Sequence, residues 1–558
     1  MPQPKWYGKS LSALCMDNIV DNMGKPMASR SSEYVSYNFD HLPSHCLKYM
    51  TECLKKDYSI TEDNYDLLLS PHLKVLDLRP DLISKLQFNS LEDGMKHGRN
   101  NAEKNLRIFR LASDRCLQLT TLKIPDRPLL FFEGERNFEV DEMFACVLQR
   151  FEHLQILDLS HTIYGERSML KLGSTNKPKI RELLVDGCPG VTDTVVEVFC
   201  TGQSSLYRLS ILNTSVTPIG IQFAIQHLPE LKELNCDNQS DVYKAFRRIR
   251  KEPRESKKYS LIKLFMENVV TKKPNGIVFS RLVPYKKGSV SLMVDMCPLV
   301  VDVLLRVNNE GFTNEELLGF RELKLLKILK IWMDRSTMSP VSIRGGVIPL
   351  LQSRGPKLEE LSLWMEVTSE EVYVIIECCP NVRRLLLVIT STDLETPELV
   401  VDDRVHSSLC SPKEVIPLRM LEAISLNSNI NPNAIFVISR KLLLLLLSSP
   451  SLTDISIDKC FTLDDQIIEE LCSENSFKYL TKLTFLGCSN VSQKGIDFFL
   501  NETNPLDEIT VKKCGNVNLE NMKTMAQEKH WDVKWNVEYF RRDYRDYYLV
   551  RQMQSNVF

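Results

Sequence analysis

The residue types that perform acid, base or nucleophilic chemistry are scattered through this 558-residue sequence and form no arrangement typical of an active site. His41 and His45 are four residues apart, but the acidic residue that a HExxH zinc motif requires is missing between them. The sequence has no glycine-rich phosphate loop, nucleophile elbow or pair of catalytic carboxylates. Cys378 and Cys379 precede Pro380 at the expected end of a helix, where a packing role is favoured. We therefore predict a non-catalytic protein without a cofactor.

The sixteen cysteines predict neither disulfides nor a metal site. They are spread along the whole chain, and no CxxC pair occurs. Four of them, Cys188, Cys460, Cys488 and Cys514, fall at equivalent points of a sequence repeat. Reduced cysteines that act as small buried apolar side chains account for this distribution. We expect a protein of the cytoplasm, the nucleus or both.

Composition and charge exclude several other classes of function. The net charge is −2 and 43% of the residues are hydrophobic, so extensive binding to nucleic acid or to an anionic membrane is not expected. The polar start, MPQPKWYGKS, lacks the apolar core of a signal peptide. The leucine run at 442–447 is too short to cross a bilayer, so it predicts a buried helix.

A narrow hydrophobic stripe near the N-terminus is the strongest sign of a binding function. In SLSALCMDNIV, Leu11, Cys15 and Ile19 are spaced four residues apart, which turns each about 40° from the last on a helix. Leu14 and Met16 broaden this stripe. The small side chain of Cys15 would let a partner approach the helix closely.

A second short hydrophobic segment follows about twenty residues later. LPSHCLKYM carries apolar side chains at Leu42, Cys46 and Met50, and Pro43 suits the first turn of a helix. The sequence therefore predicts two helices before residue 63.

The rest of the chain is dominated by a repeated phrase, apolar-x-x-apolar-x-apolar, in which x is any residue. In LKVLDL, for example, the alternation of apolar and polar residues predicts a short strand with one buried face. The best-spaced phrases lie roughly 24 to 28 residues apart, a period typical of leucine-rich repeats. The fourteen phrases begin at Leu73, Leu119, Leu154, Ile180, Leu206, Leu231, Val300, Leu326, Leu358, Val382, Leu421, Leu452, Leu480 and Leu506.

We accordingly predict an α/β fold, a curved leucine-rich repeat solenoid with one strand and one helix per repeat, preceded by a small helical segment. Helical spacing between the phrases supports this, as in VTDTVVEVF, where Thr192 or Asp193 could cap a helix. A single unit cannot bury its own apolar face, so stacking of units forms the core.

Five segments are expected along the chain. The segment dense in Lys and Arg lacks the phrase and could contact an acidic substrate or nucleic acid, but a solvated loop or a charged helix face is favoured. WDVKWNVE, near the C-terminus, is expected to be a strand that covers the open end of the array. The segments are 1–63 (helical), 64–237 (first repeat block), 238–290 (basic insertion), 291–530 (second repeat block) and 531–558 (cap with an aromatic and basic tail).

The two N-terminal signatures resemble the docking box of Cullin-2 ubiquitin ligase receptors. Ser10, Leu11, Cys15 and Ile19 fill every position of the BC-box, small-Leu-x-x-x-Cys-x-x-x-aliphatic, which binds the Elongin B/C adaptor. The segment from Leu42 to Met50 resembles the Cullin-2 box that follows it, with Cys46 in place of the usual aliphatic residue. The combination with leucine-rich repeats is similar to the Zyg-eleven family, although the armadillo-like C-terminal part of that family is missing.

This resemblance implies a non-catalytic substrate receptor, whose partners would be Elongin B/C, Cullin-2 with its RING protein, and a protein substrate. Two alternatives remain open. The LP start of the second segment also resembles an F-box, which would imply a Cullin-1 ligase, but no tryptophan follows within the next thirty residues. The chain could also be a plain repeat scaffold whose N-terminus caps the array.

A candidate substrate surface comes from the positions just after each strand core. Reading these positions through neighbouring repeats gives Trp332, Trp364 and Val388 in one row and Met333 and Met365 in the next. Tryptophan is the typical hot-spot residue of protein interfaces, and an exposed apolar patch marks a partner site. We predict that these five side chains are exposed and bind substrate.

Overall fold

The fold is available as a computed structural model of the whole chain. It describes residues 10–23, 39–56, 67–78, 106–124, 138–175, 177–236, 239–251, 257–267, 269–272, 279–282, 285–307, 311–333, 341–389, 418–428, 436–500, 506–515, 517, 520, 522–524 and 534–535.

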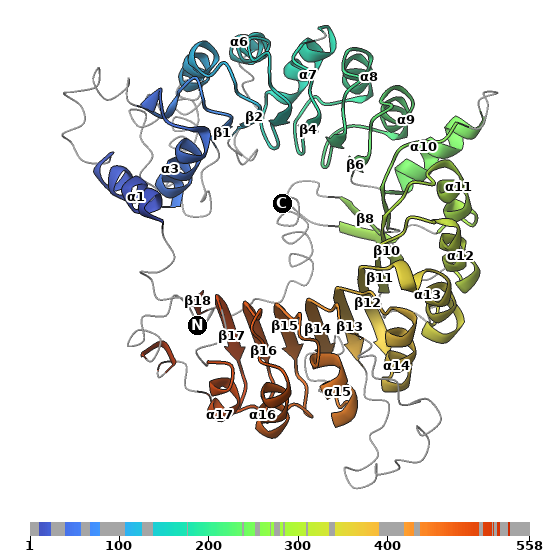
Figure 1. The fold of residues 1–558 in the computed structure, drawn as a ribbon. Coiled ribbons are helices and arrows are strands. Elements are labelled where there is room, and N and C mark those ends of the chain that lie inside the picture. Colours follow the sequence, from blue (N-terminus) through green and yellow to red (C-terminus); the bar gives the residue numbers. More distant parts are fainter. Residues whose placement is uncertain are drawn as a thin grey trace. The chain divides into compact units, whose positions relative to one another are not determined.

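The chain divides into two units, one formed by Lys9–Glu360 and the other by Leu361–Phe558 with Met1–Gly8. In both units short parallel strands alternate along the chain with helices, and the helices lie on one side of the strands (Figure 1). The predicted fold class, an α/β repeat solenoid, is confirmed. No helix in the described part of the chain is both long and apolar enough to cross a membrane.

The first unit opens with two helices, α1 (Leu11–Met23) and α3 (Ser44–Lys56), before the repeats begin. Its strands follow the order of the sequence, β1 to β6 in one parallel sheet and β7, β10 and β11 in parallel register. The strands are β1 (Val75–Asp77), β2 (Thr121–Lys123), β3 (Ile156–Asp158), β4 (Glu182–Leu184), β5 (Arg208–Ser210), β6 (Glu233–Asn235), β7 (Lys263–Glu267), β10 (Asp302–Val307) and β11 (Ile328–Met333).

Helices cover the strands of the first unit on one side (Figure 1). The first of them is the helix over residues 106–115. The others are α6 (Phe138–Leu148), α7 (Gly165–Gly173), α8 (Asp193–Gly202), α9 (Pro218–His227), α10 (Gln239–Lys251), α11 (Ser289–Met296), α12 (Asn314–Leu318), η4 (Gly319–Glu322), the π-helix η5 (Ile343–Val347), α13 (Ile348–Arg354) and η6 (Gly355–Lys357).

The second unit repeats the same arrangement. Its strands also follow sequence order, and the pairs from β13 to β18 are parallel. The elements are β12 (Glu360–Val367), α14 (Ser369–Cys378), β13 (Arg384–Ile389), β14 (Ala423–Ser428), α15 (Arg440–Leu447), β15 (Asp454–Asp458), α16 (Asp465–Glu474), β16 (Lys482–Leu486), α17 (Gln493–Asp497), β17 (Glu508–Lys512) and β18 (Lys534–Trp535).

Each of the fourteen sequence phrases contains the start of a strand, and that strand begins at the third residue of the phrase. The phrase at Leu73 leads into β1 at Val75, and the phrase at Leu506 leads into β17 at Glu508. The first residue of every phrase is almost completely buried, so stacked apolar side chains form the core. The leucine run at 442–447 lies in α15, with four of its leucines buried, as predicted.

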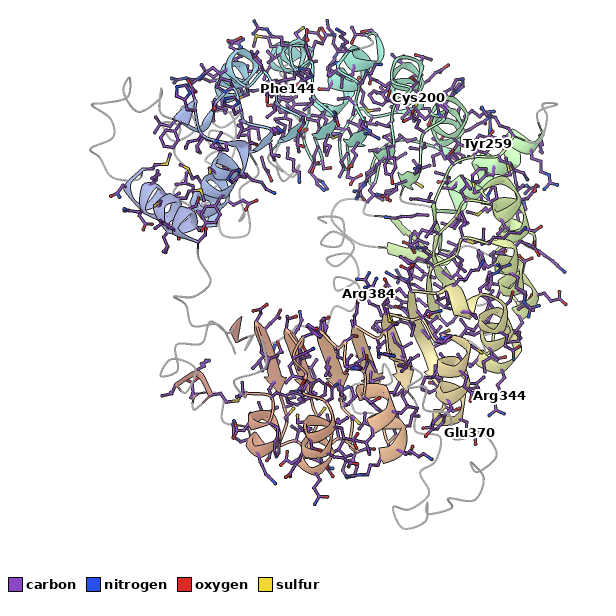
Figure 2. The ribbon with its side chains drawn as sticks, in the orientation of Figure 1. Phe144, Cys200, Tyr259, Arg344, Glu370 and Arg384 are labelled. Atoms are coloured by element: carbon purple, nitrogen blue, oxygen red, sulfur yellow. The ribbon has the colours of Figure 1, made fainter. Side chains whose placement is uncertain are left out.

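Aromatic rings add to the core of the first repeats. The ring of Phe144, labelled in Figure 2, stacks on Phe109 at 4.4 Å and on Tyr164 at 4.3 Å between ring centroids. Because these rings come from three successive repeats, they connect neighbouring units as well as filling space.

Residues 238–290, predicted as an insertion that interrupts the array, partly continue it. α10 packs against both α9 and α11, and β7 pairs in parallel with β10. The sequence LIKLFM from Leu261 to Met266 repeats the apolar phrase, and its phrase residues are buried. The boundary expected at 238 is therefore wrong, because a further repeat occupies 239–267. The antiparallel pair β8 (Val269–Lys272) and β9 (Phe279–Leu282) is the part that departs from the repeat.

The expected C-terminal cap is present as β18, which extends the parallel strands beyond β17. The tail that follows residue 535 lies outside the described residues, as do the residues that flank β18 on its N-terminal side.

The recurring cysteines form a set of equivalent contacts between neighbouring repeats. The thiols of Cys188, Cys488 and Cys514 each donate a hydrogen bond to the carbonyl oxygen of the sixth phrase residue of the preceding repeat. The contacts are Cys188 to Leu159 at 3.0 Å, Cys488 to Ile457 at 3.7 Å and Cys514 to Phe485 at 3.6 Å. The predicted role of these cysteines as buried packing groups is confirmed for Cys188, Cys460 and Cys488.

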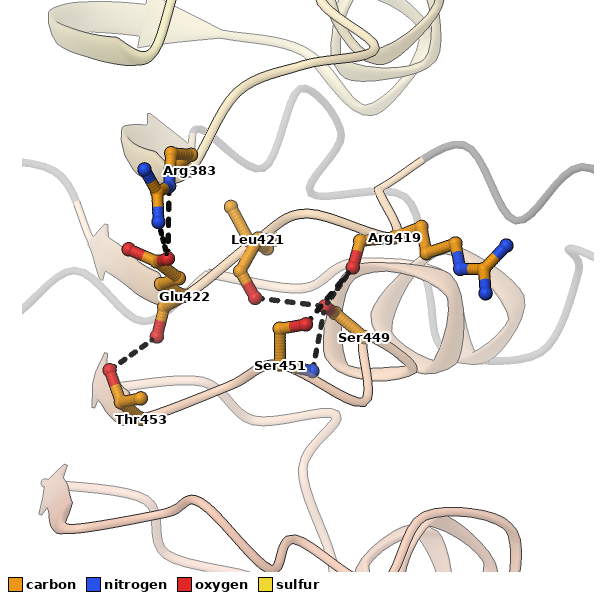
Figure 3. A network of polar contacts seen from close by, with 7 residues as sticks. All are labelled: Arg383, Arg419, Leu421, Glu422, Ser449, Ser451 and Thr453. Carbon is orange, nitrogen blue, oxygen red and sulfur yellow. Dashed lines mark hydrogen bonds and ion pairs between the residues drawn. The ribbon is translucent and has the colours of Figure 1, made fainter.

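Polar contacts also connect the starts of neighbouring strands. In Figure 3, Arg383 pairs with Glu422, and the Thr453 hydroxyl donates to the Glu422 carbonyl at 3.0 Å. Ser449 Oγ donates to the carbonyl of Leu421 at 2.8 Å. The two hydroxyl contacts satisfy main-chain carbonyls near the points where the chain enters a strand.

Exposed and half-buried hydrogen bonds link the starts of successive helices. Asp193, in the first turn of α8, accepts hydrogen bonds from Thr217 N at 2.7 Å, Thr217 Oγ1 at 2.5 Å and Gly220 N at 3.0 Å. Asp193 therefore caps the next helix, α9, and not its own helix as expected. Asp465 does the same for Ser492 at the start of α17.

We expect Asp193→Ala to lower the local free energy of opening of α9 by about 1–2 kcal/mol, because two main-chain amides lose their acceptor. Hydrogen exchange at Thr217 and Gly220 measures this loss. Asp193→Asn keeps one acceptor oxygen and should show a smaller change. Equal exchange in Asp193→Ala and the wild type would contradict this capping role.

Candidate functional site

The candidate site is built on α1, which begins with a side-chain cap. Ser10 Oγ accepts a hydrogen bond from Ala13 N at 3.2 Å, and the Ser10 carbonyl accepts one from Leu14 N at 3.0 Å. The first contact satisfies one of the amides that a helix start leaves free, and the second is the first main-chain hydrogen bond of the helix. Ser10, assigned by resemblance to the small position of the BC-box, thus fixes where the helix starts.

One face of α1 is packed against α3. Val20 and Met23 are buried, and Asp17 accepts a hydrogen bond from the Tyr49 hydroxyl at 2.7 Å. This hydrogen bond to Asp17, together with burial, raises the pKa of Tyr49 above its usual value. This buried face was not among the predicted features, although Met16, Val20 and Met23 carry the helical spacing that predicts it.

The opposite face of α1 is apolar and exposed. Leu11 is 78% exposed, Leu14 is 51% exposed and Ile19 is 39% exposed, and Cys15 is also exposed. The structure therefore brings the three predicted stripe residues, Leu11, Cys15 and Ile19, onto one accessible helix face. Met16, expected to broaden this face, is half-buried instead.

Exposed leucine and isoleucine at consecutive turns of one helix need a physical explanation, since burial of such side chains stabilises a fold by about 1.5–3 kcal/mol each. Here the opposite face of α1, which carries the buried Val20 and Met23, packs against α3 and holds the helix in place. The exposed stripe is therefore free for another molecule, and its chemistry suits the apolar groove of a helix-binding partner.

The second signature does not form one exposed surface. Pro43 is exposed and immediately precedes α3, while Leu42 and Cys46 are half-buried. Cys46 Sγ lies 3.4 Å from Nε2 of the neighbouring His45. Met50 is completely buried, so its predicted role at a partner surface is wrong in this structure.

The burial of Met50 follows from the spacing of α3. Leu47, Met50 and Leu54 lie at positions i, i+3 and i+7, and all three are fully buried. Because this stripe is the core face of α3, Met50 is out of reach of a partner, and the accessible surface of the second signature is near the start of the helix.

These two helices are fastened to the first repeats. Asp40, just before α3, pairs with Arg115 at 3.2 Å, and Arg115 ends the helix over residues 106–115. Phe39 beside it is buried. α1 is thus held through α3 rather than carried on a free tail.

The predicted substrate patch is only partly exposed. In the first unit Trp332 is half-buried and the Arg306 guanidinium lies 5.1 Å from its ring centroid, whereas Met333 is buried. Trp332 and Met333 are consecutive in β11, so they face opposite sides of the strand. The expectation that both rows point outward is therefore wrong.

In the second unit the same expectation is wrong for two further residues. Trp364 is 9% exposed and Val388 is 3% exposed, so both are buried, whereas Met365 is half-buried. Of the five predicted side chains, only Trp332 and Met365 offer accessible surface.

The cysteines of the repeats have the character of core residues. Burial raises the pKa of Cys188, Cys200 and Cys297 to about 12, so they stay protonated in neutral solution and are poor nucleophiles. Cys379 is buried with its pKa also raised by burial. Within the described ranges, no group of three or more His, Cys, Asp or Glu side chains is placed to hold a metal ion.

This difference predicts a reactivity pattern. At pH 8 iodoacetamide should alkylate the exposed Cys15 and Cys146 quickly and leave Cys188, Cys200 and Cys297 unmodified until the protein is unfolded. Peptide mass spectrometry over a time course measures each site. Rapid modification of the buried thiols in the folded protein would contradict the packing described above.

Comparisons with known proteins do not assign this chain to a family. A scan against protein-family models gives no match, and a search of curated proteins gives none either. Among solved structures, the Rad7 and Elc1 complex in yeast matches 87% of this chain and 96% of its own chain, with 13% identity and a TM-score of 0.38. At this identity and TM-score the likeness gives no information about partners or activity.

Proposed function

We propose that this protein is a non-catalytic substrate receptor of a multi-subunit ubiquitin ligase, and that α1 binds the Elongin B/C adaptor. The observation that carries the proposal is the exposed stripe of α1. Leu11, Cys15 and Ile19, the positions that match the BC-box, lie on the face of α1 turned away from α3.

The geometry suits insertion of α1 into a groove. Leu11 has the largest exposed fraction of these side chains and lies at the first residue of the helix, where it can reach a pocket without obstruction from the rest of α1. Cys15, one turn later, is small and allows close approach of the two surfaces. Docking of an amphipathic helix in a hydrophobic groove uses this i, i+4, i+8 pattern.

For the cullin, we propose contact through the start of α3 at Leu42, Pro43 and Cys46, with Cullin-2 as the partner. Met50 would then support the orientation of α3 from within the core. The repeats would hold a substrate close to the conjugating enzyme, so that the contribution of this protein is effective concentration, not chemistry. We propose the cytoplasm or nucleus as its compartment.

Co-expression of the full chain with Elongin B/C, followed by addition of Cullin-2 with its RING protein, tests the proposal in two steps. We expect Elongin B/C to co-purify in a one-to-one ratio and Cullin-2 to join only when the adaptor is present. Retention of the adaptor with Cullin-1 or Cullin-5 in place of Cullin-2 would overturn the choice of cullin alone. Failure to retain the adaptor would overturn the receptor proposal.

A plain repeat scaffold is the second candidate, and the burial of Met50 with the Asp40–Arg115 ion pair favours it. These contacts make α3 a cap for the first repeat whether or not α1 has a partner. On this alternative, the exposed stripe has no function and no adaptor co-purifies.

A further inference from the structure

α10 presents a strongly basic outer face. The sequence from Gln239 to Lys258 contains eight basic and three acidic residues, within a chain whose net charge is −2. Val242, Phe246 and Ile249 are buried against the repeats, so the basic side chains are left on the other side of the helix. Those that are exposed are Lys244, Arg248, Arg250, Lys251, Lys257 and Lys258.

Part of this charge is fixed in place by neighbouring polar groups. Arg248 Nε donates to Gln222 Oε1 of α9 at 2.9 Å. Lys244 pairs with Asp241 at 2.7 Å on its own helix. Lys258 pairs with Asp295 of α11 at 2.5 Å. These two acidic partners, Asp241 and Asp295, leave Arg248, Arg250, Lys251 and Lys257 to give the face a positive potential that attracts an anionic partner.

A small pocket lies where the chain returns from α10 to β7. Its volume is about 120 Å³, and buried apolar side chains from α9 and the adjoining turn line it, together with Leu261. Lys257 and Lys258 line it as well. This volume is far below the roughly 300–1,000 Å³ of a small-molecule site, so it suits a single side chain.

The pocket and the basic helix are joined through Tyr259. This residue lines the pocket, and its ring lies 6.0 Å from the ring of Phe246 in α10, measured between centroids. Figure 2 places Tyr259 beside α10. Ser260, next along the chain, donates from Oγ to the Pro229 carbonyl at 3.2 Å and so holds this segment against the end of α9.

We propose that α10 and this pocket together bind an acidic peptide segment of a partner protein that carries one aliphatic anchor residue. The basic side chains attract the carboxylates, and the apolar pocket takes the anchor. Nucleic acid is disfavoured because the phosphate backbone would leave the apolar pocket unused. The site is separate from α1, so the inference holds whether or not α1 binds an adaptor.

Fluorescence anisotropy with labelled peptides tests the inference on the full chain. The probe is a twelve-residue peptide of Glu, Asp and Gly with one central Leu, compared with the same peptide carrying Ser in place of Leu. Loss of the buried leucine should weaken binding about tenfold or more. Added salt should weaken the binding of both peptides.

Charge reversal locates the site. Arg248→Glu with Lys251→Glu should weaken binding of the Leu peptide at least tenfold without lowering the melting temperature of the protein. Lys441→Glu with Lys478→Glu, which reverses two exposed lysines in the second unit, is the matched control and should stay within twofold of the wild type.

Three outcomes would overturn the inference. The first is that neither peptide binds, and the second is that the two peptides bind with equal affinity. The third is that the two double variants bind the Leu peptide with equal affinity. A duplex DNA of twenty base pairs that binds more tightly than the Leu peptide and is lost on charge reversal would instead make this face a nucleic-acid surface.

Discussion

The double substitution Leu11→Ser with Cys15→Asp is expected to weaken Elongin B/C binding more than a hundredfold. Loss of the leucine side chain removes about 2–3 kcal/mol of apolar burial at the interface. A carboxylate at position 15 would have to be desolvated in an apolar groove, which adds a further cost. Together these terms exceed the roughly 2.7 kcal/mol that a hundredfold change in Kd requires. Titration of Elongin B/C onto the immobilised protein measures it.

The fold itself should not change in this variant, because Leu11 and Cys15 are exposed and α1 is held by its other face. The melting temperature should therefore match that of the wild type. Ser12→Asp is the matched control, since Ser12 is exposed on the same helix but lies to the side of the stripe. Equal loss of binding in this control and in the double variant would contradict an interface limited to the stripe.

Gln203→Leu should have the largest effect on stability, a loss of about 3 kcal/mol. The side chain of Gln203 is 2% exposed and lies just after α8. Its Oε1 accepts from Ile180 N at 3.0 Å, and its Nε2 donates to the carbonyls of Leu172 and Pro178, both at 3.0 Å. Leucine has a similar size but leaves these buried main-chain groups without a partner, at about 1–3 kcal/mol each.

Urea denaturation followed by circular dichroism measures this loss as a fall in the midpoint concentration. Gln155→Leu is the control, because the Gln155 side chain is exposed and should change stability by less than about 0.5 kcal/mol. A Gln203→Leu midpoint equal to that of the control would show that the network contributes little to folding.

The strands could be predicted from the sequence because the repeat phrase encodes burial directly. Each phrase places leucine-like residues at fixed positions, and a strand follows in all fourteen cases. The phrase at Leu261 was not predicted, because the lysines and arginines before it are typical of an insertion. Its three apolar positions, Leu261, Leu264 and Met266, carry the same pattern and would have identified the repeat.

The candidate sites were predictable to different degrees. On α1 the spacing of Leu11, Cys15 and Ile19 predicts a shared face, and the structure confirms that this face is exposed. Along the strands, the exposure of a side chain depends on the length of its strand and on the side chains that cover it. β1 to β6 have three residues each, whereas β10 to β14 have six to eight. The same phrase position therefore lies beyond the end of a short strand but still inside a long strand. Met333 is buried for this reason.

Alkylation of Cys15 with and without Elongin B/C tests the central claim most directly, since Cys15 lies in the middle of the exposed stripe. Cys146, also exposed but located on α6, serves as the internal reference in the same sample. We expect saturating adaptor to slow modification of Cys15 at least tenfold and to leave the rate at Cys146 unchanged. Equal rates at Cys15 in the presence and absence of the adaptor would contradict the assignment of α1 as the adaptor-binding helix.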